Sequence, residues 1–103
     1  MTALTEHHSV LFPEDYDAQS EYETPFRGYL SDVIVQTADG SRYRLFFIDP
    51  TRLQQELAEQ TASGRRYFTE PNLVVIPEVT TASVRQAVDG LVRDGYFQHL
   101  KPL

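Results

Sequence analysis

Residues 33–57 read VIVQTADGSRYRLFFIDPTRLQQEL and decide the fold, because they spell out two strands, a turn and the start of a helix. Asp39 and Gly40 supply the turn between two runs of strand-forming residues. Asp49 followed by Pro50 is typical of a helix N-cap and first helical position. The stretch therefore predicts a β-hairpin that leads directly into a helix.

The turn allows two registers of this hairpin. A two-residue loop would place Val35 opposite Arg44 and scatter the apolar side chains over both faces. A three-residue loop, in which Gly40 is left-handed and forms a bulge, pairs Val35 with Tyr43. We expect burial to select the second register. It gathers the following side chains on one face: Val33, Val35, Tyr43, Leu45 and Phe47.

The first strand of the hairpin is expected to begin near Phe26. The helix that follows the hairpin is expected to reach Ser63 and to end at Gly64, with Leu53 and Leu57 in a narrow apolar stripe. A last helix, capped by Thr80 or Thr81 and ended by Gly95, has the clearest helical spacing of apolar residues. These residues are Val84, Ala87, Val88, Leu91 and Val92.

Between the two helices, residues 66–76 predict a second hairpin. Glu70-Pro71-Asn72 supplies the turn, and the apolar run Leu73–Ile76 indicates a central strand buried on both faces. The predicted fold is therefore α+β with the order ββαββα, in which a mainly antiparallel sheet carries two helices on one face. A short extra strand at residues 9–12 is a further expectation.

The acidic residues are distributed unevenly. Residues 1–24 hold six acidic residues and no Lys or Arg, so they carry the whole formal charge of −6, whereas residues 25–103 hold nine of each sign. We predict an acidic N-terminal arm over 1–24, partly disordered or docked, and a single α+β domain over 25–103. The segment is either a solvated tail or an arm that docks on a basic surface, of its own domain or of a partner, with aromatic side chains as anchors. These are Phe12, Tyr16 and Tyr22.

Composition excludes several classes of function. The chain has no cysteine, which excludes disulfides and zinc–thiolate sites, and it has no apolar run of the ~18 residues that a membrane span requires. Isolated glycines form no phosphate-binding loop, and the acidic segment repels nucleic acid. We expect a soluble cytoplasmic protein with no cofactor, no nucleic-acid partner and no membrane partner.

No catalytic residue or metal ligand stands out. His7 and His8 are adjacent in the acidic segment, and His99 has no evident relation to a serine or an acid. Asp32 lies near Arg42 and Arg44 on the outer face of the predicted hairpin, so acid–base catalysis with arginine as an anion clamp is one alternative.

The preferred hypothesis is a non-catalytic protein-interaction module, of inhibitor or immunity type by analogy, that binds a protein partner or associates with itself. The alternative is a small-molecule sensor or minor enzyme, with a pocket between sheet and helices lined by Tyr43, Tyr67, Phe68 and Tyr96. The predicted partner-binding residues are Asp32, Ile34, Arg42, Arg44, Phe46, Arg65, Arg66 and Tyr67.

Overall fold

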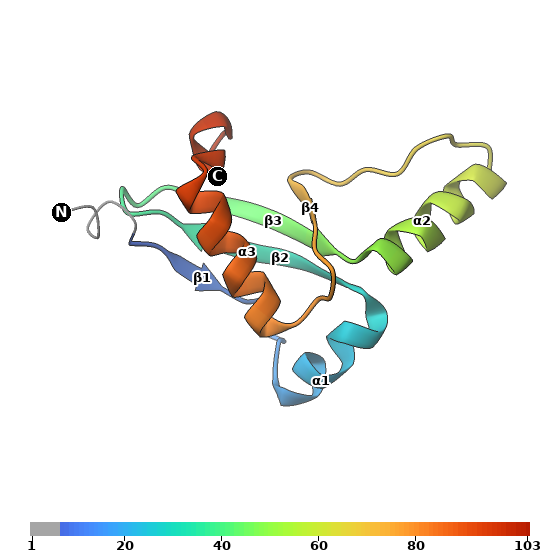
Figure 1. The fold of residues 1–103 in the computed structure, drawn as a ribbon, viewed down its shortest axis with the longest axis horizontal. Coiled ribbons are helices and arrows are strands. Elements are labelled where there is room, and N and C mark those ends of the chain that lie inside the picture. Colours follow the sequence, from blue (N-terminus) through green and yellow to red (C-terminus); the bar gives the residue numbers. More distant parts are fainter. Residues whose placement is uncertain (1–6) are drawn as a thin grey trace.

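The protein is an α+β chain built on one mixed four-stranded sheet, seen in a computed structural model that describes residues 7–103 (Figure 1). The strands lie in the order β1-β2-β3-β4, with β1–β2 and β2–β3 antiparallel and β3–β4 parallel. The elements are β1 Ser9–Leu11, α1 Ala18–Arg27, β2 Tyr29–Gln36, β3 Arg42–Ile48, α2 Pro50–Ala62, β4 Leu73–Val75, α3 Thr81–Arg93 and the 3-10 helix η2 Tyr96–His99.

The β2–β3 hairpin has the predicted register. Val35 pairs with Tyr43 and Val33 with Leu45. Gly40 has a φ of 87°, and its amide donates to the carbonyl of Thr37. The three-residue loop with a left-handed glycine is thus confirmed, and so is the short strand β1.

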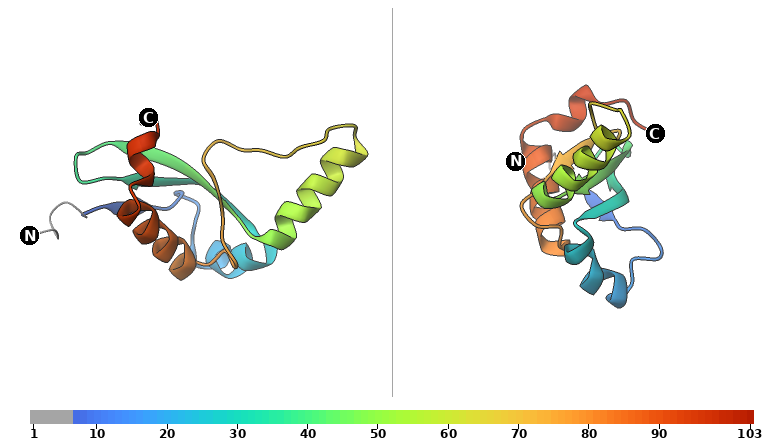
Figure 2. Two further views of the ribbon diagram at one scale, coloured as in Figure 1. Left: turned by 45° about the horizontal axis from the view of Figure 1, so that its top comes forward. Right: turned by 90° about the vertical axis from the view of Figure 1, so that its right-hand side faces the viewer.

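The core lies between one face of the sheet and α3. Val84 and Val88 of α3 are fully buried, and Thr80 caps the helix by accepting from the amide of Ser83 at 3.0 Å. Figure 2 shows α3 lying across the sheet. The buried core also contains the five residues that the predicted register gathers: Val33, Val35, Tyr43, Leu45 and Phe47.

The predicted second hairpin is wrong. Residues 65–72 form no strand, and β4 alone joins the sheet, parallel to β3. Asn72 has a φ of 53°, accepts from the amide of Phe46 and donates its side-chain amide to Arg44 O, so it marks where the segment joins the sheet. β4 is an edge strand and Val75 is 47% exposed, so the prediction of a central strand is also wrong.

The expected start of the first strand near Phe26 is wrong as well, because Phe26 belongs to α1. Asp17 caps this helix by accepting from Ser20 N at 2.9 Å, and Gly28 ends it with a φ of 80°. Pro25 lies in the last turns, where its missing amide removes only one helical hydrogen bond. The structure therefore has three α-helices instead of two, and residues 1–6 of the acidic N-terminal segment lie outside the described residues.

The prediction that two helices pack on one face also fails for α2. No residue of α2 is buried, and the helix points away from the sheet in Figure 1 and in the left view of Figure 2. Together with residues 63–72 it forms a projecting arm, which we define as residues 50–72. The radius of gyration is 14.7 Å, against about 13 Å expected for a chain of this length.

Beyond α3 and η2, the chain returns to the sheet. The amide of Leu103 donates to Arg42 O at 2.8 Å, at the start of β3. Phe97 of η2 is buried in the core, where its ring centroid lies 5.0 Å from that of Tyr43. The last residues of the chain therefore pack against the start of β3, and the other end of β3 leads into α2 and the projecting arm.

Candidate protein-binding surface

The face of the sheet opposite α3 carries most of the predicted binding residues. Because side chains alternate along a strand, Ile34, Arg44 and Phe46 point away from the core. Arg44 Nε lies 3.5 Å from Asp32 Oδ1, and Arg42 Nε donates to Gln36 Oε1 at 2.8 Å. Both arginines are exposed, so this ion pair contributes little to stability and leaves the guanidinium groups accessible.

An apolar strip lies beside these arginines. Ile34 is half-buried and sits directly opposite Leu11 of β1, which is exposed. Phe46 is half-buried at the other end of the strip. We call this surface, made of Leu11, Asp32, Ile34, Arg42, Arg44 and Phe46, the open sheet face.

Phe46 connects the open sheet face to the projecting arm. Its ring centroid lies 6.0 Å from that of Tyr29, in a stacked arrangement, and 6.5 Å from that of Phe68 on the arm. The Arg52 guanidinium sits 4.8 Å from the Tyr29 ring and pairs with Glu56 at 2.7 Å. These five residues, with Ile48 and Glu70, line a cavity of about 220 Å³ at the base of the arm.

The base of α2 is held in a fixed direction. Asp49 caps the helix by accepting from Arg52 N at 2.7 Å, and its own amide donates to Gly28 O at 2.9 Å. A Cβ on residue 28 would lie 2.8 Å from Arg52 Cβ, so only glycine allows this close approach. The predicted N-cap is confirmed, and the corner between α1 and α2 is tightly packed.

The remaining predicted residues lie at the tip of the arm, away from the arginines of the sheet. Gly64, with a φ of 97°, ends α2 as predicted, and Arg65 N donates to Gln60 O. Arg65 and Arg66 are exposed, and neither has an ion-pair partner within residues 7–103. Tyr67 is 60% exposed, so the tip presents two unpaired positive charges beside an aromatic ring.

Two exposed aromatic residues lie together on α1, namely Tyr22, which was assigned to the acidic segment, and Phe26, which was not predicted as a binding residue. Tyr22 is 72% exposed and Phe26 is 79% exposed, and their ring centroids lie 5.6 Å apart. They occupy positions i and i+4 of one helix, which places them on the same face. The spacing is readable in the sequence once Pro25 is allowed inside the helix.

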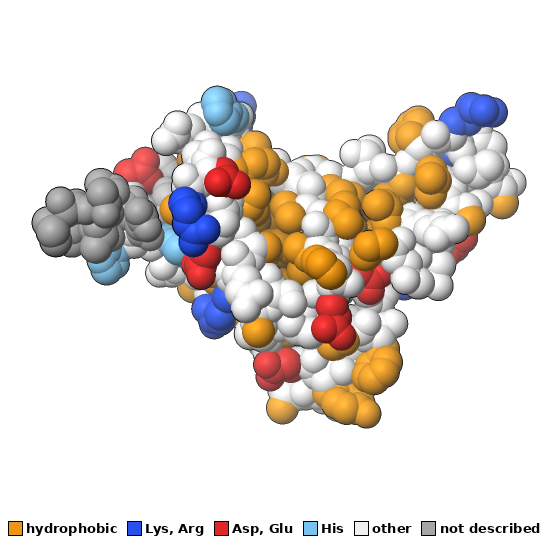
Figure 3. Space-filling model, viewed as in Figure 1, with side chains coloured by type: hydrophobic (Ala, Val, Ile, Leu, Met, Phe, Trp, Pro, Cys, Tyr) orange, Lys and Arg blue, Asp and Glu red, His pale blue; other side chains and the backbone are white. Residues whose placement is uncertain are grey.

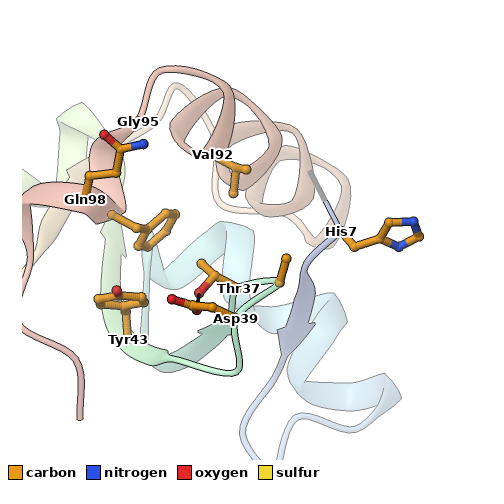
Figure 4. Close-up of a pocket in the computed structure, with 9 residues that line it drawn as sticks. His7, Thr37, Asp39, Tyr43, Val92, Gly95 and Gln98 are labelled. Atoms are coloured by element: carbon orange, nitrogen blue, oxygen red, sulfur yellow. Dashed lines mark hydrogen bonds between the residues drawn. The ribbon is translucent and has the colours of Figure 1, made fainter. Parts of the chain in front are cut away.

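The predicted small-molecule pocket does not assemble as a single site. Tyr43 lines a cavity of about 290 Å³ between the hairpin turn and the end of α3, together with Asp39, Val92 and Gln98 (Figure 4). Tyr67 and Phe68 lie on the projecting arm instead. Tyr96 packs edge-on against Phe97 at 5.3 Å between ring centroids.

The ionisable groups have local structural roles. A hydrogen bond from the Ser20 amide lowers the pKa of Asp17, and one from the Thr37 hydroxyl lowers the pKa of Asp39. His8 Nε2 lies 2.8 Å from Asp89 Oδ1, which ties the start of β1 to α3. In the part of the chain that the structure describes, no three His, Asp or Glu side chains cluster in a way that could hold a metal ion.

Comparison of the chain with protein-family models, with curated proteins and with solved structures finds no match. Across residues 7–103, no helix is both long enough and apolar enough to cross a bilayer. The evidence for a binding surface therefore comes from the geometry of this chain alone. That surface consists of the projecting arm, the open sheet face and the exposed aromatic pair of α1.

Proposed function

We propose that this protein is a non-catalytic protein-interaction module that binds its partner through the projecting arm and the adjoining open sheet face. One observation carries the proposal. α2 is a complete helix, capped at both ends and anchored at its base, but none of its 13 residues is buried. Nothing within the described chain covers the outer surface of this helix.

The energetics of short helices support this proposal. An isolated helix shorter than about 12–15 residues is marginally stable in water, and most helices in proteins gain their stability from packing. α2 packs against the body at its base, where Arg52 contacts Tyr29, and near its far end Gln60 lines a small cavity with Tyr67 and Phe68 of the arm itself. Leu57, one turn further along, is 43% exposed. A partner that covers Leu57 and Tyr67 would supply the missing packing.

The side chains also define the chemistry of the partner. Exposed arginines stand on both the sheet and the arm, and each set lies beside apolar or aromatic side chains, as is common at protein interfaces. Hydrophobic side chains also gather in the hollow between α3 and α2, where β4 lies (Figure 3). We therefore expect a partner that presents carboxylates next to aromatic or aliphatic side chains.

Site-specific photo-cross-linking tests this function. A photoreactive amino acid would replace Tyr67 on the arm or Arg44 on the open sheet face, and in a control variant it would replace Gln86, which is exposed on α3. In the cells that make the protein, we expect discrete protein adducts from the first two positions and none from Gln86. Equal labelling from all three positions, or no adduct at all, would overturn the proposal.

A second candidate, binding of a small organic cation, is favoured by the cavity in Figure 4. The carboxylate of Asp39 lies near the Tyr43 ring in this cavity, which Phe97 also lines, and a carboxylate with aromatic rings suits a cation with an apolar body. The cavity of about 290 Å³ lies just below the usual range for ligand sites, which begins at about 300 Å³. Shifts of these two ring signals on titration with a quaternary amine would favour this function over the first.

A further inference from the structure

We infer that the protein associates with itself, so that the arm tip of one copy binds α1 of a second copy and the reverse contact forms at the same time. This inference rests on the proposed function, because it names the partner of the arm. It is carried by two surfaces of the same chain that are complementary in charge and in aromatic character. These surfaces are the tip, with Arg65, Arg66 and Tyr67, and the α1 face, with Tyr22, Glu23 and Phe26.

The segment that leads into and forms α1 is mainly acidic, and its basic residue, Arg27, stands in the last turn of the helix. Residues 14–26 contain five acidic residues and no Lys or Arg. The segment is tied to the body by Tyr16, whose hydroxyl lies 2.8 Å from Thr81 Oγ1, and by Phe12, which stacks on Tyr16. Glu21 also joins this anchor, because it accepts from Thr81 Oγ1 at 2.8 Å, and Glu23 accepts from its helix neighbour Gln19 and stays exposed. No carboxylate of this segment has an ion-pair partner in the described chain.

The exposed aromatic pair makes α1 more than a charged surface. Tyr22 and Phe26 are the two most exposed large hydrophobic residues among those described. Gln19 and Glu23 lie next to them, on the Phe26 side of the pair, on a helical wheel at about 100° per residue. Aromatic side chains and arginines are both enriched in interfaces, and an arginine can pair with a carboxylate while it stacks on a ring. The tip of the arm supplies two arginines and a tyrosine of its own.

The geometry prevents the arm from reaching α1 of its own chain. α1 ends at Gly28 and α2 begins after Asp49, and a hydrogen bond joins these two residues at a shared corner. The two helices diverge from this corner (Figure 1). With 13 residues α2 carries the tip about 20 Å away from the corner. The complementary surfaces therefore cannot meet within one molecule.

A two-fold axis between the α2 helices of two copies allows both contacts, tip to α1 and α1 to tip, to form at the same time. Each tip then contacts α1 of the other copy, and the two α2 helices run antiparallel with Leu57 close to the axis. Such an isologous contact closes on itself and contains every interaction twice. It also covers the exposed side of α2, which is the feature that requires a partner. A second copy fits better than an unrelated acidic protein, because one chain carries both halves of the contact.

Charge-reversal variants of the full chain test this inference by sedimentation equilibrium. We expect the natural chain to sediment at twice its mass of 11.8 kDa. Arg65→Glu/Arg66→Glu and, separately, Gln19→Arg/Glu23→Arg should each weaken the dimer at least tenfold, because each leaves charges of the same sign in contact. The control Arg93→Glu/Lys101→Glu makes the same charge change as the tip variant at exposed positions outside both surfaces, and it should leave the dimer intact.

An equimolar mixture of the tip variant and the α1 variant provides the decisive measurement. In the mixed pair, each tip again meets an α1 of opposite charge, so the dimer should return although neither variant dimerises alone. Circular dichroism of each variant would verify that it is folded. A natural dimer that neither variant weakens, or two monomeric variants that stay monomeric when mixed, would overturn the inference.

The cross-linking experiment separates the failure of this inference from the failure of the proposed function. A natural chain that sediments as a monomer, while a photoreactive group at Tyr67 labels a different protein, would overturn self-association and leave the interaction module standing. A monomer without any adduct would overturn both. An adduct at twice the mass of the chain would support both.

Discussion

Helices α2 and α3 resemble each other locally but differ completely in their packing. Each has 13 residues and an N-cap side chain that accepts a hydrogen bond from a backbone amide three residues later. Each is followed by a glycine with positive φ, Gly64 or Gly95. Nevertheless α3 places Val84 and Val88 at the centre of the core, whereas α2 has no buried residue. Caps and helix formers therefore determine where a helix forms but not what it packs against.

The difference follows from the apolar pattern and from the anchor at the base of α2. α3 has five apolar residues at helical spacing, a stripe wide enough to cover a sheet. The stripe of α2 has only Leu53 and Leu57 at its centre. The packing of Asp49 and Arg52 against Gly28 then directs the helix away from the sheet. Because α2 has so few apolar side chains to bury, it would gain little free energy by packing onto the sheet.

The largest contrast should come from truncating one apolar residue in each helix. Val88→Ala removes two fully buried methyl groups and leaves a cavity, so it should lower the free energy of unfolding by about 1.5–3 kcal/mol. Leu57→Ala on the exposed face of α2 should cost under about 0.5 kcal/mol in the monomeric tip variant. Urea denaturation of both variants measures these two losses in the free energy of unfolding. Equal losses would mean that α2 packs against the body in solution.

A smaller effect is expected from Gly28→Ala at the corner that directs the arm. The left-handed backbone alone should cost about 1–2 kcal/mol, and the new Cβ would press on Arg52 Cβ at 2.8 Å. Hydrogen exchange should therefore accelerate at the start of α2 while the amides of α3 change much less. Gly64→Ala is a matched control, because its φ is also positive but its surroundings are empty. A uniform acceleration across both helices would contradict a local anchor.

The smallest effect should come from pH. The pKa values of Asp17 and Asp39 are lowered in the folded state by the hydrogen bonds from Ser20 and Thr37, relative to the ordinary value of 3.8. Both carboxylates therefore stabilise the fold above pH 3.8, and this contribution disappears as the pH falls through the lowered pKa values. Asp17→Asn and Asp39→Asn should each flatten the acid side of a stability–pH curve. Neither residue lies in α2 or α3, so the contrast between these helices should persist throughout.

The sequence predicts the parts of the fold that depend on local chemistry. The register of the hairpin follows from Asp39-Gly40 and the alternation around it, and the caps at Asp49 and Thr80 follow from residue type. The segment 66–76 was predicted wrongly because Pro71 and Asn72 suit a hairpin turn as well as a junction with a parallel strand. Only the non-local pairing of β4 with β3 distinguishes the hairpin turn from the junction with a parallel strand.

The candidate site was predictable to a similar degree. Alternation along β3 places Arg42 and Arg44 on the outer face, and the sequence Arg65-Arg66-Tyr67 indicates a charged and aromatic surface. The contact of Phe68 with Phe46, which joins the arm to the open sheet face, depends on the path of an irregular segment. The pairing of Tyr22 with Phe26 was missed because Tyr22 was assigned to the acidic N-terminal arm, whereas Phe26 was expected at the start of the first strand. Tertiary geometry, and not residue type, decides these features.

The hydrogen bond from Leu103 to Arg42 O constrains how a partner can bind to β3. A strand edge with free amides and carbonyls invites strand addition and, with it, uncontrolled aggregation. Leu103 occupies one of the backbone acceptors at the start of β3, and β4 occupies the other end of the same edge. Recognition through this strand therefore has to use side chains, which confer selectivity, rather than backbone pairing, which any extended peptide could satisfy.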